Sequence, residues 1–152
     1  MPQLTAELIA VLQPNGILTK ETQLELAQYA SQAKESSYSP YSNFRVGAAL
    51  LAADGQVFLG CNVENASYGG TICAERTAFV KAVSEGVKTF LAIAVITDKD
   101  TAISPCGVCR QFMVEFGKNL MVYQFSKNFK VVAIKSLKEL LPDSFGPEDL
   151  DA

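Results

Sequence analysis

Three cysteines and one glutamate are the residues of this chain whose types and spacing point most directly to chemistry. They stand in two motifs, Cys73-Ala74-Glu75 and Pro105-Cys106-Gly107-Val108-Cys109. The sequence contains no histidine, so a zinc ion here would be held by sulfur. A structural zinc has four protein ligands, whereas a catalytic zinc has three and keeps one position for water. The number of sulfur ligands therefore decides between a structural and a catalytic site.

The two motifs stand where helices are predicted to begin, and the free N–H groups at a helix start lower the pKa of a thiol. Cys106 and Cys109 are three residues apart and share one side of a first helical turn, while Cys73 opens the other helix. We predict these three cysteines as the zinc ligands. Residues two apart on a helix face different ways, so Glu75 is predicted to move protons at the metal rather than to bind it.

Two arginines follow the cysteines closely. Three thiolates on a divalent ion leave about one excess negative charge, because cysteine binds metals deprotonated. Arg76 lies three residues after Cys73, and we predict that its guanidinium compensates this charge without binding the metal. Arg110, beside Cys109, is a second candidate for the same role. The alternative for both is an ordinary solvated helix charge.

A structural zinc site is the main alternative from the residues alone. Pro105-Cys106-Gly107-Val108-Cys109 by itself fits structural zinc or redox chemistry as well as it fits a catalytic site. A four-sulfur site would need Cys61, which ends a predicted strand among apolar residues and is predicted to be a small buried hydrophobe. Adding Cys73-Ala74-Glu75 gives the signature of zinc-dependent deaminases in its three-cysteine version, and so favours catalysis.

The elements that must position these residues follow from periodicity and turn signals. We predict, in order, a helix from a cap at Thr19 to about residue 36, a hairpin of strands 45–52 and 56–61, a helix 73–85, a strand 90–97, a helix 106–116, strands 121–125 and 130–135, a short helix 137–141 and an acidic tail 143–152. This order favours an α/β fold, a three-layer α/β/α sandwich with a mixed sheet of about five strands. Residues 1–17, with apolar side chains at helical spacing over 4–12, are predicted to be an N-terminal extension of a single domain 18–152.

Composition narrows the functional classes. A length of 152 residues suits one domain. Charged residues make up 19%, below the roughly 25% of an average soluble protein, which suggests that subunits bury one another's apolar surface. A net charge of -3 argues against a nucleic-acid partner.

The N-terminus lacks the pattern of an export signal, and no apolar stretch is long enough to span a bilayer, so four reduced cysteines and a cytoplasmic location are expected.

With these residues assembled, the chain resembles the small, three-cysteine, homotetrameric cytidine deaminases. Besides the two cysteine motifs, the match includes residues 41–50, 60–69 and 140–150 and covers about 19–150. The resemblance implies one zinc per subunit and hydrolytic deamination of cytidine and 2′-deoxycytidine, with release of ammonia, in pyrimidine salvage. It also implies that Asn62 and Glu64 bind the ribose hydroxyls, that Phe44 lies against the pyrimidine, and that Ala66 and Tyr68 line the pocket.

The same resemblance implies that Phe145 reaches an active site in a neighbouring subunit. Four of these substrate residues have a structural alternative: Asn62 and Glu64 as turn residues, Phe44 as core, and Phe145 as an anchor for its own tail. A related three-cysteine deaminase acting on a blasticidin-type nucleoside antibiotic also remains open. Deamination of polynucleotides is disfavoured, because the acidic composition offers no basic channel.

Overall fold

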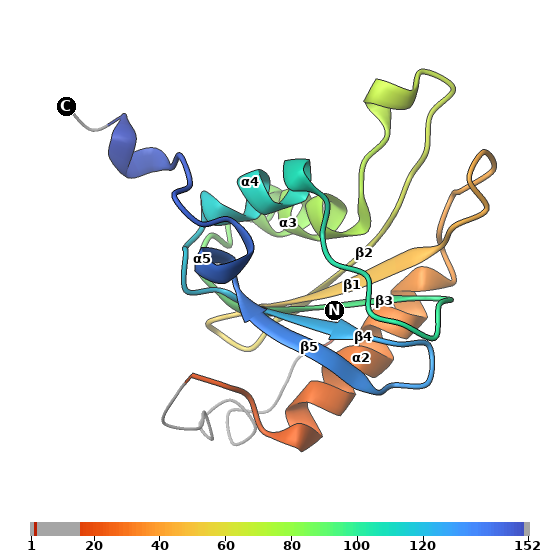
Figure 1. The fold of residues 1–152 in the computed structure, drawn as a ribbon, viewed down its shortest axis with the longest axis horizontal. Helices are drawn as coiled ribbons and strands as arrows, with labels where there is room; N and C mark the ends of the chain where they lie inside the picture. Colours follow the sequence, from red (N-terminus) through yellow and green to blue (C-terminus); the bar gives the residue numbers. More distant parts are fainter. Residues whose placement is uncertain (1, 3–15, 151–152) are drawn as a thin grey trace.

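The described part of the chain, residue 2 and residues 16–150 of a computed structural model, alternates helices and strands (Figure 1). The elements are α2 (Lys20–Lys34), β1 (Val46–Ala52), β2 (Val57–Cys61), α3 (Ala74–Ser84), β3 (Phe90–Thr97), α4 (Gly107–Val114), β4 (Met121–Phe125), β5 (Val131–Ser136) and α5 (Leu137–Leu140), with short 3₁₀ turns at Tyr68–Gly70 and Pro147–Asp149. The helical pattern predicted over 4–12 lies outside the described residues.

One mixed sheet of five strands forms the middle of the fold, in the order β2-β1-β3-β4-β5. Neighbouring strands are antiparallel except for β3 and β4, which are parallel because the chain returns through α4. Helix α2 covers one face of the sheet, and α3 and α4 cover the other (Figure 1). The predicted three-layer α/β/α fold is confirmed.

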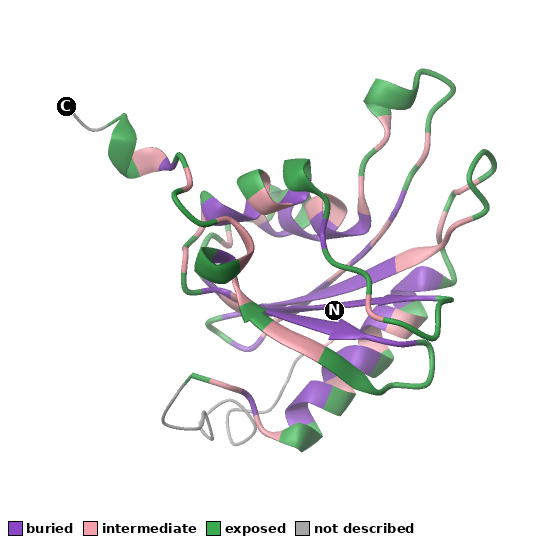
Figure 2. Cartoon of the chain, viewed as in Figure 1, coloured by how far each residue is buried: buried purple, intermediate pink, exposed green. Residues whose placement is uncertain are grey.

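Both faces of the central strands are buried (Figure 2). On β1, Ala48 and Leu50 pack toward α3 and α4, while Ala49 and Leu51 pack toward α2. Successive side chains of a strand point to opposite faces, so a strand covered on both sides is a continuous apolar run rather than an alternating one. This is why residues 46–52 carry no polar side chain.

Two strand glycines let the helices approach the sheet closely. A Cβ on Gly47 would lie 1.9 Å from the carbonyl oxygen of Ala30 in α2, and a Cβ on Gly60 would lie 2.3 Å from that of Ala74 in α3. Both contacts are with backbone, which cannot move without shifting the whole helix. Gly60 therefore fixes the distance between the sheet and the first turn of α3, next to Cys73.

We expect Gly47→Ala to lower the free energy of unfolding by about 3 kcal/mol or more, because overpacking against backbone cannot relax locally. Urea denaturation followed by circular dichroism measures this. Gly69→Ala is the matched control, since its Cβ would meet nothing within 4 Å and its φ is not positive. Equal stability of the two variants would contradict the close-packing argument.

An ion cluster joins the start of β1 to the end of β3. Arg45 contacts Asp98 through two bonds, Nε to Oδ2 at 2.8 Å and Nη2 to Oδ1 at 3.0 Å, and its Nη1 contacts Glu35 at 3.0 Å. The nearly buried Lys34 donates to Asp98 at 2.7 Å. Hydrogen bonds from Arg45 and Lys34 lower the pKa of Asp98 to about 2.

We expect Asp98→Asn to destabilise the protein by about 1 to 2 kcal/mol at pH 7, a modest value because the Asp98 side chain is 46% exposed. The folded pKa lies below the unfolded value of about 3.9, so this stabilisation is complete above about pH 5 and is lost as the pH falls toward 2. The difference in unfolding free energy between the two proteins should therefore shrink by about half at pH 3. Asp100→Asn, which removes only an exposed pair with Lys127, should change little at either pH.

Candidate active site

The first turn of α3 presents one cysteine and one glutamate. Cys73 is the N-cap, with extended backbone (φ -67°, ψ 157°), and its carbonyl accepts from Thr77 N at 3.0 Å. Two residues within a helix that are two positions apart face different ways. Cys73 is the N-cap and has extended rather than helical backbone, so this constraint does not apply to the directions of the Cys73 and Glu75 side chains. The carboxyl of Glu75 is buried, with 5% of the residue exposed.

The first turn of α4 presents the other two cysteines. Cys106 is its N-cap, and Cys109 is buried one turn later. The sulfur atoms of Cys73, Cys106 and Cys109 all lie within 4.8 Å of one another, with 3.9 Å between those of Cys73 and Cys106. Zinc bonds to sulfur of about 2.3 Å in a tetrahedron place two sulfurs about 3.8 Å apart, so this set fits a zinc ion.

The thiols of Cys73 and Cys109 shift each other's pKa in opposite directions. Hydrogen bonding from the Cys109 thiol, helped by Arg76, lowers the pKa of Cys73 to about 5. The same contact with Cys73, together with burial, raises the pKa of Cys109. Cysteine binds a metal as thiolate, so metal binding has to release the protons that these thiols still carry.

Glu75 lies beside the sulfurs without being one of the clustered metal-binding groups. Its Oε2 accepts from the Cys109 sulfur at 3.8 Å. Burial raises the pKa of Glu75 to about 7, and the negative charge of Cys73 adds to this shift. A carboxyl with a pKa near neutrality is suited to taking up and giving back a proton.

The two arginines near the cysteines differ in their contacts. Arg76 donates from Nη2 to the sulfur of Cys73 at 3.6 Å and to the carbonyl of Thr71 at 3.2 Å, and its buried Nε has no hydrogen-bond partner among the described residues. A cation at this place offsets the negative charge of the sulfurs. The structure gives Arg110 a different role: its Nε, Nη1 and Nη2 donate to Pro105 O, Leu140 O and Ser104 Oγ, at 2.6–2.8 Å. Arg110 thus clamps the loop before α4 to the end of α5.

Cys61 is placed apart from the sulfur cluster. It ends β2 opposite Gly47, and its sulfur donates to the carbonyl of Ser36 at 3.3 Å. Within residues 16–150, the group that could hold a metal consists of three cysteines and excludes Cys61. The geometry therefore does not support the four-cysteine structural site.

A short irregular ladder brings the predicted sugar-binding segment next to Cys73. Val63 pairs with Ile72, which precedes Cys73, and on its other side with Tyr38. The side chain of Asn62 is buried and bonds through both ends of its amide: Oδ1 accepts from Val46 N at 3.0 Å and from Ser37 Oγ at 2.5 Å, and Nδ2 donates to Phe44 O at 2.7 Å. Asn62 therefore fixes the Phe44 loop, in line with the structural alternative, and keeps one amide hydrogen for a ligand.

Glu64, the other predicted sugar contact, accepts from Tyr41 N and Ser42 N, both at 3.0 Å, and from Ser42 Oγ. It lines a cavity of about 250 Å³ together with Tyr41, Ser42, Tyr68 and Thr71. The rings of Tyr41 and Tyr68 lie 5.8 Å apart. Tyr68, in the predicted pocket loop, is thus brought to Glu64, and Ser42 is a neighbour that the sequence reasoning did not single out.

The remaining predicted contacts are more exposed. The Phe44 ring is partly buried, with Lys99 Nζ 5.9 Å from its centre. Ala66 is exposed on the loop before Tyr68. Phe145 is 56% exposed, and its carbonyl accepts from Gln111 Nε2 of α4 at 2.9 Å. The chain beyond Phe145 leads away from the sheet (Figure 1).

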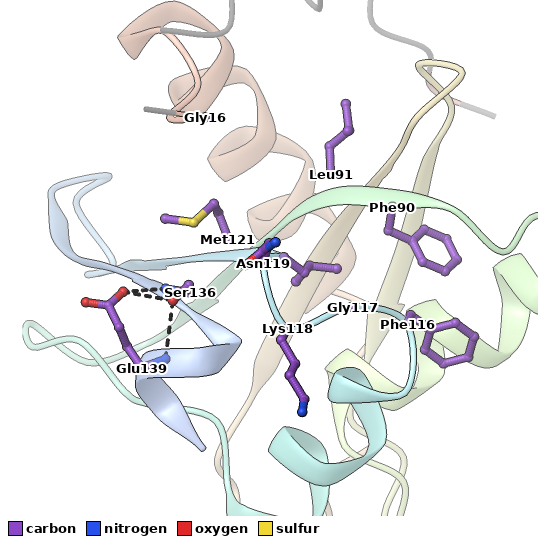
Figure 3. Close-up of a pocket in the computed structure, with 11 residues that line it drawn as sticks. Gly16, Phe90, Leu91, Phe116, Gly117, Lys118, Asn119, Met121, Ser136 and Glu139 are labelled. Atoms are coloured by element: carbon purple, nitrogen blue, oxygen red, sulfur yellow. Dashed lines mark hydrogen bonds between the residues drawn. The ribbon is translucent and has the colours of Figure 1, made fainter. Parts of the chain in front are cut away.

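A larger cavity of about 620 Å³ lies elsewhere, where β3 and β4 begin (Figure 3). Phe90, Phe116 and Lys118 are among its lining residues, whereas the sulfur cluster follows the other end of β3. Two of its polar side chains, Ser136 and Glu139, bond to each other in the capping box of α5 (Figure 3). This cavity is not part of the cysteine site.

No helix in residues 16–150 is long and apolar enough to cross a membrane.

A family model, curated proteins and solved structures that are similar to this chain all point to the same family. Residues 20–125 match the family model described as the cytidine and deoxycytidylate deaminase zinc-binding region. A cytidine deaminase of Sporosarcina psychrophila is 47% identical over 126 residues, 83% of this chain and 93% of that protein. A probable cytidine deaminase of Dictyostelium discoideum is 51% identical over 132 residues, 81% of this chain and 83% of that protein. The crystal structure of a cytidine deaminase from Burkholderia pseudomallei has a TM-score of 0.77 at 47% identity, over 84% of this chain and 100% of that one.

The fold and the three-sulfur site define an enzyme with a zinc-binding deaminase domain. The chain belongs to the cytidine and deoxycytidylate deaminase family. The predicted resemblance, enzyme class and zinc cofactor are thereby confirmed. The domain boundary at residue 18 and the roles of individual site residues stay predictions.

Proposed function

We propose that this chain catalyses the zinc-dependent hydrolytic deamination of cytidine and 2′-deoxycytidine to uridine and 2′-deoxyuridine, releasing ammonia, as a step of pyrimidine salvage. The observation that carries the proposal is the cluster of three sulfurs beside the buried carboxyl of Glu75. The cytidine deaminases that cover most of this chain support the choice of substrate.

Cys73, Cys106 and Cys109 would hold the zinc. When bound, zinc acts as a Lewis acid that lowers the pKa of water toward neutrality. Glu75 takes a proton from the attacking water and delivers it to N3 of the cytosine ring, which makes C4 more electrophilic. The water oxygen bonds to C4, and a second transfer through Glu75 carries the remaining proton of that oxygen to the amino group, so that the C4–N bond breaks and ammonia leaves. Arg76 keeps the charge of the sulfurs in balance and so preserves the Lewis acidity of the site.

The nucleoside would bind along the Asn62–Glu64 segment. Glu64 accepts a hydrogen bond from a sugar hydroxyl, Asn62 donates its remaining amide hydrogen, and the Phe44 ring lies against the pyrimidine. Ala66 and Tyr68 line the loop that borders the sugar. The ladder between Val63 and Ile72 supports this placement, because it sets the segment beside Cys73.

The assembly we propose is a homotetramer in which Phe145 reaches the site of a neighbouring subunit. Large apolar side chains left exposed on α4, on the pocket loop and on the tail support this, namely Val108, Tyr68, Phe145 and Leu150. Light scattering should give a mass of about four times the 16.4 kDa of the chain. A mass of one chain would refute the shared site.

The cytoplasm is the compartment we propose, because three cysteines that bind metal as thiolates, and a fourth that is free, suit a reducing environment. Fractionation of the cells that express the protein tests this, and recovery with a secreted marker would refute it.

Ammonia release from cytidine by the zinc-loaded protein, with uridine identified as the product and zinc measured per chain, tests the activity. Parallel assays with 2′-deoxycytidine and with a blasticidin-type antibiotic distinguish the two kinds of three-cysteine deaminase. Turnover of the antibiotic but not of cytidine would overturn the proposal.

A further inference from the structure

The hydroxyl of Ser42 links two residues that the proposed function assigns to different parts of the substrate. It donates to Oε2 of Glu64, and it accepts from the backbone N–H of Phe44 at 3.0 Å. Glu64 follows β2 and Phe44 precedes β1, and the Ser42 hydroxyl bonds to both residues at once. We propose that Ser42 is a positioning residue, which sets the sugar-binding carboxylate and the base-contacting loop relative to each other. The inference rests on the proposed function.

The hydrogen bonds of Glu64 show what Ser42 contributes. A carboxylate has about four acceptor positions. The N–H groups of Tyr41 and Ser42 occupy both positions on Oε1, and the Ser42 hydroxyl occupies one on Oε2. By this count one position on Oε2 remains for a donor from a ligand. Ser42 thereby fixes both the orientation of the carboxylate and the direction from which one sugar hydroxyl can approach it.

The charge of Glu64 supports the same role. Hydrogen bonds from Ser42 lower the pKa of Glu64, and the bond from the Ser42 hydroxyl has a larger effect than the bond from its N–H. The carboxylate therefore stays ionised and acts as an acceptor only, which suits a sugar hydroxyl as its donor.

The loop around Phe44 is held from two sides. Its N–H is bound by Ser42 Oγ, and its carbonyl is bound by Asn62 Nδ2 at 2.7 Å. Loss of the Ser42 hydroxyl frees one end of this loop and one oxygen of Glu64 together. Asn62 still holds the other end, so we expect the loop to stay folded.

Steady-state kinetics on two nucleosides test the proposal. With cytidine, Ser42→Ala should raise KM about tenfold, the effect of losing a charged hydrogen bond, while kcat changes by less than about threefold. With 2′,3′-dideoxycytidine, which lacks the 2′- and 3′-hydroxyls that Glu64 is proposed to bind, the same variant should lose less than about threefold in kcat/KM. Ser42→Thr keeps a hydroxyl and should restore the KM for cytidine. Ser39→Ala, in the same loop, is the control and should match wild type.

A double-mutant cycle guards against a general folding effect. In a Glu64→Gln background, Ser42→Ala should add little further rise in KM, because Ser42 acts through Glu64. Additive losses, or equal losses on both nucleosides with normal zinc content and circular dichroism, would overturn the role of Ser42. A Ser42→Ala variant that does not fold would also overturn it, since Asn62 would then not suffice to hold the loop. If wild-type protein releases no ammonia from cytidine, the proposed function fails and this role fails with it.

Discussion

Replacing Glu75 with glutamine is expected to lower the turnover of cytidine by about 10²- to 10⁴-fold, the contribution typical of general acid–base catalysis. Glutamine has the same shape as glutamate but cannot take up a proton from water or return it to the substrate. Its amide can still occupy the buried space beside Cys109. Zinc content and thermal stability should therefore remain close to those of wild type, so that the loss is confined to kcat.

Glu115→Gln is the matched control, because it makes the same chemical change at an exposed residue just after α4. It should leave turnover unchanged. The measurement is single-turnover and steady-state conversion of cytidine, with zinc determined on the same samples. Full turnover by Glu75→Gln with zinc present would show that the proton passes through another group.

Local spacing was sufficient to predict that Cys73, Cys106 and Cys109 lie together. Cys106 and Cys109 share the first turn of one helix because they are three residues apart, and Cys73 caps the other helix because its motif begins there. The position of each cysteine at a helix start depends only on residues close to it in the sequence, so it could be predicted from the motifs. Periodicity likewise predicted the nine helices and strands of the described residues, with errors of a residue or two at the ends.

Contacts between distant segments were not predictable in this way. The side chain of Asn62 reaches Phe44 and Val46 because β1 and β2 pair in one particular register. The guanidinium of Arg110 turns to Leu140 rather than to a sulfur because α5 packs against α4. The spacing of residues in the sequence does not predict where the side chains of Asn62 and Arg110 point. The hydroxyl of Ser42 was overlooked for the same reason, since its partner Glu64 lies on another segment.

The close approach of α3 to the sheet connects the fold to the chemistry. Gly60 allows the backbone of Ala74 to lie directly on β2, which holds Cys73 and Glu75 at a fixed depth. The other two sulfurs are set independently by Pro105 and the start of α4. The sulfur cluster thus lies between two helices on one face of the sheet: α3 brings Cys73 and Glu75, the proposed proton carrier, and α4 brings Cys106 and Cys109.

Removal of one ligand sulfur is expected to abolish both zinc binding and activity, whereas removal of Cys61 should affect neither. Cys106→Ala leaves two sulfurs, too few for a catalytic zinc site, so zinc per chain should fall from about one toward zero and turnover toward background. Cys61→Ala removes a sulfur that bonds only to the carbonyl of Ser36 in the described structure. It should retain zinc and at least half of the activity. Elemental analysis after gel filtration, with ammonia release on the same fractions, makes the comparison. Loss of zinc from Cys61→Ala would mean that a fourth sulfur joins the metal, and the site would then be structural rather than catalytic.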